Sequence, residues 1–349
     1  MTSLTARLCT AGALATAIVV CAPWSVRFAG QEAGAARTSY LPPRTPWGDP
    51  DLQGTFTNKY EQSTPLERPP EFNGRGVEDV AGAELATLLE KRQQQVLERG
   101  AGVGPFQFRD SLDVTRGSRA WLIVDPRDGR VPPLTAAAAR TIGPPDAEQD
   151  SGIQGIVNQR RRTASSFGDG PFNGPDDLTL WERCITRGLP GAMLPHILGN
   201  SYEIVQAPGV VSIRYELVHD ARMIPLDGRA HVSKAVRFEM GDPRGYWDGN
   251  TLVIETTNFK ERSTFRDASA ATLRLVERFT RTSAEQIEWS VTVDDPATWT
   301  RPWTFAMPLT MNDAEPVLEF ACHEGNYALR HILSSARAGE YNGDSANTR

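Results

Sequence analysis

The feature that most constrains the fold of this chain is a succession of short β-type runs between residues 202 and 310. They cover residues 202–206, 210–217, 221–225, 236–239, 246–247 with 251–256, 273–280, 287–293 and 303–310. Turn signals such as Asp227-Gly228 and Asp248-Gly249-Asn250 separate several of them. Short strands joined by turns predict an antiparallel meander, and a meander of about eight strands commonly closes into a barrel, because closure removes exposed edges. We therefore expect a mainly β protein with a lipocalin-like (calycin-like) barrel.

Alternation within these runs predicts that one side of the sheet forms the interior. Side chains two residues apart in a strand share a face. In the run 287–293 one face carries Ile287, Trp289, Val291 and Val293. The other face of the run is polar, so the apolar face is expected to line the barrel.

The N-terminal half, residues 36–200, is expected to be loop-rich and packed on the barrel. The chain of 349 residues contains 30 Gly and 25 Pro, a high share for a helical protein. Short strands are predicted at 51–57 and 121–125. One amphipathic helix is predicted over 81–99, because Leu85, Leu88, Leu89 and Val96 recur at helical spacing.

The C-terminal end of the barrel domain, which is expected over 201–338, is predicted to be a short amphipathic helix. Its apolar residues are Leu329, Ile332, Leu333 and Ala336. Residues 339–349 are expected to form a disordered tail.

Residues 1–35 are predicted to be a secretory signal peptide. Arg7 precedes an Ala- and Val-rich stretch over 8–26, and Ala33-Gly34-Ala35 offers a cleavage signature. An uncleaved N-terminal anchor is the alternative. Export predicts a periplasmic or extracellular location, with no membrane contact after cleavage.

Cysteine usage agrees with export. Cys9 and Cys21 lie in the predicted signal peptide, which leaves Cys184 and Cys322 in the mature chain. Two thiols in an oxidising compartment are expected to pair, so we predict a Cys184–Cys322 disulfide. A two-cysteine zinc site is the weaker alternative, because the chain has no C-x-x-C spacing.

The charge pattern and the missing motifs exclude several classes of function. The net charge is −6 and there is no Lys/Arg run, which argues against a nucleic-acid partner. The chain has no G-x-S-x-G elbow, no P-loop and no G-x-G-x-x-G fingerprint. We therefore expect no nucleotide cofactor, and a small molecule as ligand or substrate.

Two clusters carry residues suited to acid–base chemistry. In the first, His219, Asp220 and Arg222 are candidates for a general base, its partner and an anion clamp. The alternative for this cluster is a hairpin turn with a surface histidine. In the second, His323 and Glu324 are catalytic candidates beside Cys322, where a disulfide would hold their backbone. The residues that follow, Asn326 and Tyr327, are ligand-binding candidates.

Two further clusters lie between residues 226 and 249. Arg229 and His231 are ligand-binding candidates, and they share a face if their segment is extended. Asp242 and Arg244 are catalytic candidates, with Tyr246 and Trp247 as aromatic residues that could line a binding mouth. A loop salt bridge with two core aromatics is the alternative. No resident metal is predicted; a scattered site built from His219, His231, His323 and a carboxylate is the remaining metal alternative.

Four runs of sequence together resemble one family of secreted bacterial proteins. They cover residues 46–54 (PWGDPDLQG), 219–222 (HDAR), 241–253 (GDPRGYWDGNTLV) and 321–327 (ACHEGNY). Where relatives read R-G-R-W-E-G-D-T-L, this chain has Tyr246, Asp248 and Asn250, and the shorter Asp248 reaches less far. The resemblance implies a shared fold, an exported location and the pairing of the two cysteines. It implies no reaction.

These observations favour a secreted enzyme that uses acid–base chemistry on a small polar molecule, as a hydrolase, lyase or isomerase. The alternative is a non-catalytic, lipocalin-like protein that binds a small apolar or aromatic ligand. Support for this alternative comes from four tryptophans in the strand region, Trp247, Trp289, Trp299 and Trp303. An envelope structural protein is a third alternative. The residues that line cavities distinguish the three.

Overall fold

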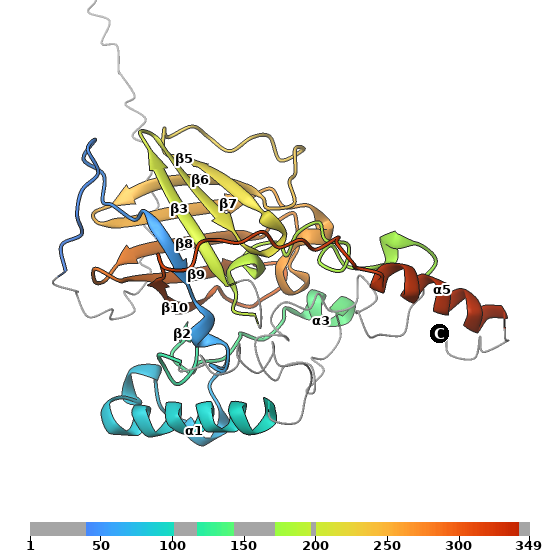
Figure 1. The fold of residues 1–349 in the computed structure, drawn as a ribbon, viewed down its shortest axis with the longest axis horizontal. Helices are drawn as coiled ribbons and strands as arrows, with labels where there is room; N and C mark the ends of the chain where they lie inside the picture. Colours follow the sequence, from blue (N-terminus) through green and yellow to red (C-terminus); the bar gives the residue numbers. More distant parts are fainter. Residues whose placement is uncertain (1–39, 101–116, 143–171, 197–199, 342–349) are drawn as a thin grey trace, which may run out of the picture. The chain divides into compact units, whose positions relative to one another are not determined.

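A computed structural model describes residues 40–100, 117–142, 172–196 and 200–341 of the protein. The predicted signal peptide lies outside the described residues. The fold is mainly β (Figure 1). The strands are β1 (Gly54–Thr57), β2 (Ile123–Asp125), β3 (Ser201–Ala207), β4 (Val210–Tyr215), β5 (Ala221–Pro225), β6 (Asp242–Asp248), β7 (Thr251–Thr257), β8 (Arg274–Arg281), β9 (Gln286–Asp294) and β10 (Trp303–Met311). The described α-helices are α1 (Gly82–Gly100), α3 (Ala136–Ile142) and α5 (Ala328–Tyr341).

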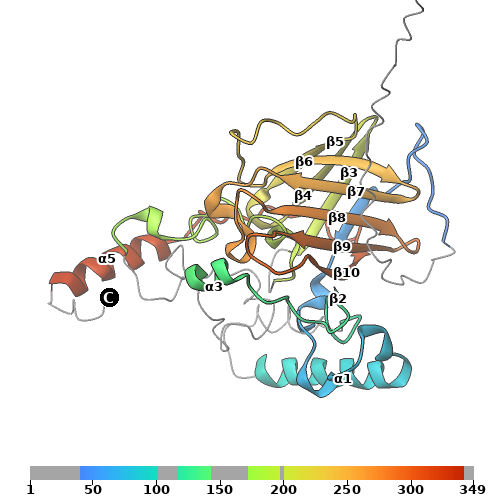
Figure 2. The ribbon, with the colours of Figure 1, turned by 180° about the vertical axis from the view of Figure 1, so that it is seen from behind.

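The strands form one antiparallel sheet that nearly closes into a barrel, which confirms the predicted fold class. Its order is β5-β4-β3-β1-β10-β9-β8-β7-β6, and β2 pairs with β10. Two meanders, β3–β5 and β6–β10, are joined by β1, which pairs with β3 on one side and β10 on the other. Figure 2 shows strands of the second meander from behind. The N-terminal half therefore supplies part of the wall, in addition to the expected helix.

The barrel has a seam between β5 and β6, the two edge strands. Nine antiparallel strands in a row leave the first and the last running in the same direction, and no ladder joins this pair. Side chains close the seam instead. A Cβ atom on Gly245 of β6 would lie 2.7 Å from the Ile224 side chain and 2.6 Å from that of Leu226. Glycine is therefore required where the two edges pack.

The predicted turns are confirmed where strands pair in sequence. Asp248 pairs with Thr251, so Gly249 and Asn250 form a two-residue hairpin loop in which Gly249 has φ 60°. The predicted strand at 236–239 is absent. Those residues belong to the connection from β5 to β6, and only Phe238 forms an isolated bridge, with Phe259.

The interior is filled by the alternating apolar residues of the strands. In β9, Ile287, Trp289, Val291 and Val293 are all buried, as predicted. Two residues of α1, Leu85 and Leu88, pack against the same core.

The C-terminal helix α5 is also confirmed. It extends to Tyr341, three residues into the segment expected to be a tail. None of its described side chains is buried. Across the described residues, no helix combines the length and the apolar character that a membrane span requires.

Candidate functional site

An open cavity of about 220 Å³ lies beside the end of β4. Its walls come from two places far apart in the chain, the β4–β5 connection and the segment that follows β10. The lining residues are Arg214, Tyr215, His219, Val317, Leu318 and Glu319. We call this cavity the His219 pocket.

The backbone under the pocket is strained. After β4 a short 3-10 turn, Leu217–His219, reverses the chain into β5. Within it Val218 has φ 58° and His219 has φ 44°. Left-handed backbone is uncommon for any residue except glycine and is an outlier for a β-branched one. Such a conformation persists only where the surroundings hold it, and it is found often at functional sites.

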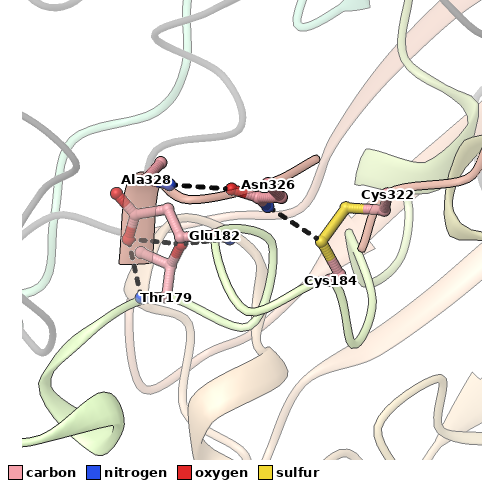
Figure 3. The surroundings of a disulfide bond; sticks show 6 residues. All are labelled: Thr179, Glu182, Cys184, Cys322, Asn326 and Ala328. Atoms are coloured by element: carbon pink, nitrogen blue, oxygen red, sulfur yellow. Dashed lines mark hydrogen bonds between the residues drawn. A yellow bond between two sulfur atoms is a disulfide. The ribbon is translucent and has the colours of Figure 1, made fainter. Parts of the chain in front are cut away.

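A small apolar cluster and a disulfide hold this turn. Cys184, Leu217 and Val218 are buried together, and Phe320 and Cys322 pack against them. The predicted Cys184–Cys322 bond is present, with the two Cα atoms 5.8 Å apart (Figure 3). The bond joins the segment before β3 to the segment after β10. His219 and His323 each directly follow a member of this cluster in sequence.

The residues after the disulfide take different roles. Asn326 donates a hydrogen bond from Nδ2 to Cys184 Sγ (3.4 Å) and accepts one from the Ala328 backbone N–H (3.2 Å), as Figure 3 shows. It therefore caps the start of α5. His323 and Glu324 are exposed, and no hydrogen bond joins their side chains to a described residue. Tyr327 is exposed as well, with its ring beside that of His331.

His219 lines the pocket, and Asp220 follows it in the chain without being part of the lining. The His219 imidazole is exposed and makes no hydrogen bond to a described residue. The neighbouring carboxylate of Asp220 accepts a hydrogen bond at Oδ2 from Thr186 Oγ1 (2.6 Å). Burial raises the pKa of Asp220, although this hydrogen bond and the charge of His219 oppose the shift. An available imidazole thus stands beside a carboxyl group that retains its proton to higher pH.

The third member of the predicted cluster, Arg222, points the opposite way. Alternation along β5 directs it into the barrel, where it binds Glu277 of β8 with two hydrogen bonds of 2.5 and 2.7 Å. Both side chains are buried, and Trp289 Nε1 also donates to Glu277 (3.2 Å). Burial alone would lower the pKa of Arg222, but the charge of Glu277 raises it. This guanidinium is therefore committed to an internal ion pair.

Arg222 nevertheless lies close to the pocket wall. Its guanidinium carbon is 5.9 Å from the ring centroid of Tyr215. Burial raises the pKa of the Tyr215 phenol, which stays neutral behind the pocket.

A second group of predicted residues lies close together on the outer face of the barrel. His231 Nδ1 is 3.1 Å from Asp242 Oδ2, and His231 Nε2 is 3.4 Å from Glu255 Oε1. Arg244 Nη1 donates to Asp242 Oδ1 at 2.6 Å. The buried Asp242 also accepts the Val232 backbone N–H (2.9 Å). Three predicted site residues, His231, Asp242 and Arg244, are thus brought together.

This arrangement continues across β8 and β9. Glu255 Oε2 accepts a hydrogen bond from Arg274 (2.5 Å), and Arg274 lies 3.5 Å from Asp294. Burial would raise the pKa of Glu255, but the bond to Arg274 and the charges of Arg274 and His231 lower it. We call these six residues, His231, Asp242, Arg244, Glu255, Arg274 and Asp294, the His231 network. Each of them has an ionic partner within it.

The remaining predicted residues do not join either group. Arg229 binds Asp227 of its own turn, with Nε 2.9 Å from Oδ1. Tyr246 is 55% exposed on the outer face, whereas Trp247 packs against the core. Because neighbours in a strand face opposite sides, these two aromatics do not line one mouth.

No metal centre emerges from the described residues: no group of three or more His, Cys, Asp or Glu side chains there is arranged to hold an ion. Comparison of the chain with protein-family models, with curated proteins and with solved structures finds no match in any of the three. The site therefore rests on its geometry.

Several pocket residues escaped the motif analysis. Arg214 lies outside every predicted cluster, and Leu318 follows a strand without any polar signal. Thr186, the hydrogen-bond partner of Asp220 outside the pocket lining, was not singled out either. Glu319 begins the run that holds Cys322, and the disulfide is the signal that could have placed it near His219. Arg214 could not be assigned before the outward face of β4 was known.

Proposed function

We propose that the protein is an exported acid–base enzyme that acts on a small polar molecule in the His219 pocket, as a hydrolase, lyase or isomerase. One observation carries the proposal: an imidazole without a hydrogen-bond partner among the described residues faces a cavity, and the half-buried carboxyl group that follows it in the chain has a raised pKa. Structural histidines are ordinarily engaged, as His231 is. A general base needs at least one ring nitrogen that the substrate can reach.

Each pocket residue has a role in this proposal. His219 takes a proton from the substrate or from a water molecule and returns it to the leaving group; Asp220 follows it in the chain and does not line the pocket. Arg214 binds Glu203 through Nε (2.9 Å), and its terminal nitrogens make no hydrogen bond to a described residue. They supply the anion contact that was expected from Arg222.

The size of the cavity limits the substrate. Pockets for drug-sized ligands occupy about 300–1,000 Å³, and this one is about 220 Å³. Export and the absence of nucleotide-binding motifs agree with a small metabolite-like substrate.

The experiment is a turnover screen with small chromogenic esters, phosphate esters and glycosides, followed by variants. His219→Gln should lower the rate on any substrate found by about a hundredfold or more. His331→Gln, which changes an exposed imidazole on α5, is the matched control and should retain the rate. Turnover that survives His219→Gln unchanged, or no turnover of any substrate, would overturn the proposal.

A second candidate is the non-catalytic binding of a small apolar or aromatic ligand in the same pocket. It is favoured by Leu318, which is 64% exposed on the pocket wall. A fluorescent apolar dye such as 1-anilinonaphthalene-8-sulfonate tests it. Binding that is lost in Leu318→Ala and retained in His219→Gln, without turnover, would favour this function.

A further inference from the structure

The connection between β5 and β6, residues 226–241, lies over the seam of the barrel. We call it the strap. It contains no strand, and most of its residues are exposed. Its first residue, Leu226, packs at Gly245, where the two edge strands meet. A change in the position of the strap would therefore change the closure of the seam.

Two sets of contacts hold the strap. Its second half is fixed by hydrogen bonds to carbonyl oxygens: Asn258 Nδ2 donates to those of Val232, Ser233 and Val236, each at 3.1 Å. Arg237 Nη1 donates to those of Phe259 (3.0 Å) and Ala270. Its first half is fixed by ionic groups, because His231 reaches Asp242 and Glu255, and Arg244 Nε donates to the Ala230 carbonyl (3.1 Å). Only the first half contains a group that changes charge near neutral pH.

The contacts that His231 can make differ between its neutral and its protonated form. A neutral imidazole has one N–H, so it can donate to only one of two carboxylates, whereas an imidazolium donates to both. Asp242 lies at Nδ1 and Glu255 at Nε2. Protonation therefore adds a charge-assisted hydrogen bond between the strap and the barrel.

The charged groups around His231 carry a net negative charge. The groups that face His231, directly or through one or two partners, come from four strands: Asp242 and Arg244 of β6, Glu255 of β7, Arg274 of β8 and Asp294 of β9. Three carboxylates and two guanidinium groups leave one negative charge in excess. Within the strap, Asp227 pairs with Arg229, and Glu239 pairs with Lys260 outside it. An imidazolium at His231 makes the network neutral.

We infer that the strap is a pH-sensitive closure of the barrel seam, with the His231 side chain as its latch. In mildly acidic solution the imidazolium binds both carboxylates and holds the first half of the strap against β6 and β7. As the pH rises, one of these hydrogen bonds is lost and the strap loosens from Leu226 to Val232, while the contacts of Asn258 keep the second half in place. This role is separate from the acid–base chemistry proposed for the His219 pocket.

Hydrogen–deuterium exchange of the full chain tests the inference, with rates corrected for the intrinsic dependence on pH. In the wild-type protein, exchange of residues 226–232 should rise about tenfold between about pH 5.5 and about pH 8. The Val232 amide reports the latch directly, because it donates to Asp242. Residues 233–238 should change much less.

Two variants and one control make the result specific. His231→Gln cannot be protonated, so its strap should show no dependence on pH. Glu255→Gln retains the imidazole and removes one carboxylate, so the dependence should be reduced but present. His331→Gln should behave as the wild type. A wild-type strap that exchanges equally at both pH values, or a His231→Gln strap that retains the full dependence, would overturn the inference.

Discussion

His219 and His231 lie in regions of opposite character. His219 stands on a strained turn held by a disulfide, faces a cavity and has no hydrogen-bond partner among the described residues. His231 lies over paired strands, between two carboxylates. The first imidazole is available to a ligand, and the second is occupied by the protein itself.

The difference follows from how the two regions are built. On a sheet, register places side chains opposite one another: Arg274 of β8 faces Asp294 of β9, and their side chains lie 3.5 Å apart. Opposite charges so placed become pairs. The pocket combines the end of β4 and its following turn with the segment after β10, whose polar groups have no such register. A group can therefore remain unpaired there.

Breaking the disulfide should have the largest effect and should separate the two regions. The bond spans 138 residues, so Cys184→Ser is expected to lower the free energy of unfolding by about 4–5 kcal/mol. Urea denaturation measures the loss. The lower free energy of unfolding raises exchange through global unfolding throughout the sheet. Exchange should nevertheless increase more in residues 217–220 than in 242–257, because the bond lies beside the former. Equal loosening of both regions would contradict the comparison.

The internal ion pair gives the next largest effect. Arg222→Met leaves Glu277 buried without its partner and should cost about 3–5 kcal/mol of stability. Combining it with Glu277→Leu should recover most of the loss, since replacing both charges removes the unpaired one. A double-mutant cycle by urea denaturation measures this coupling. Additive losses would show that the pair is not a unit.

The same variants test whether Arg222 takes part in catalysis. If Arg222 serves only the interior, the stability-rescued double variant should retain the rate of any activity that depends on His219. Loss of the rate in the double variant would show that Arg222 serves the pocket as well as the internal ion pair.

Much of the fold was predictable because local sequence patterns determine it. Period-two alternation and turn residues identified β3 to β5 and β7 to β10, and helical spacing identified α1. The position of β1 between β3 and β10 was not predictable, because that pairing joins residues about 150 and 250 positions apart. The strand predicted at 236–239 is absent, because this segment pairs with the rest of the described chain only at the bridge between Phe238 and Phe259.

The candidate site was predictable only in part. Clustering in sequence singled out His219, which the structure places at a cavity, and the cysteine count identified the disulfide. The same clustering grouped Arg222 with His219, although β5 directs it inward. Which face of a strand lines the interior depends on the whole sheet, so a short motif does not reveal it.

The pH dependence of stability should differ in sign between the two regions. Burial raises the pKa of Asp220 in the folded protein. Its contribution to stability is therefore fully present below the unfolded pKa of about 3.9 and is lost as the pH rises through the folded value. The pKa of Glu255 is lowered. Its contribution is present above the unfolded pKa of about 4.3 and is lost as the pH falls through the folded value.

Urea midpoints of the wild type, Asp220→Asn and Glu255→Gln, taken between about pH 3 and about pH 7, measure both effects. The stability of the wild type relative to Asp220→Asn should fall as the pH rises. Relative to Glu255→Gln it should rise. Two slopes of the same sign would remove this distinction between the pocket and the network.

The most direct test of the account is the reactivity of the individual histidines toward diethyl pyrocarbonate, which acylates accessible, unprotonated imidazole. Peptide mass spectrometry at about pH 7 gives a rate for each residue of the folded protein. His219 should react about tenfold faster than His231, because the latter is held between Asp242 and Glu255. A His231 that reacts as fast as His219 would contradict the claim that one imidazole is free for a ligand and the other is committed to the fold.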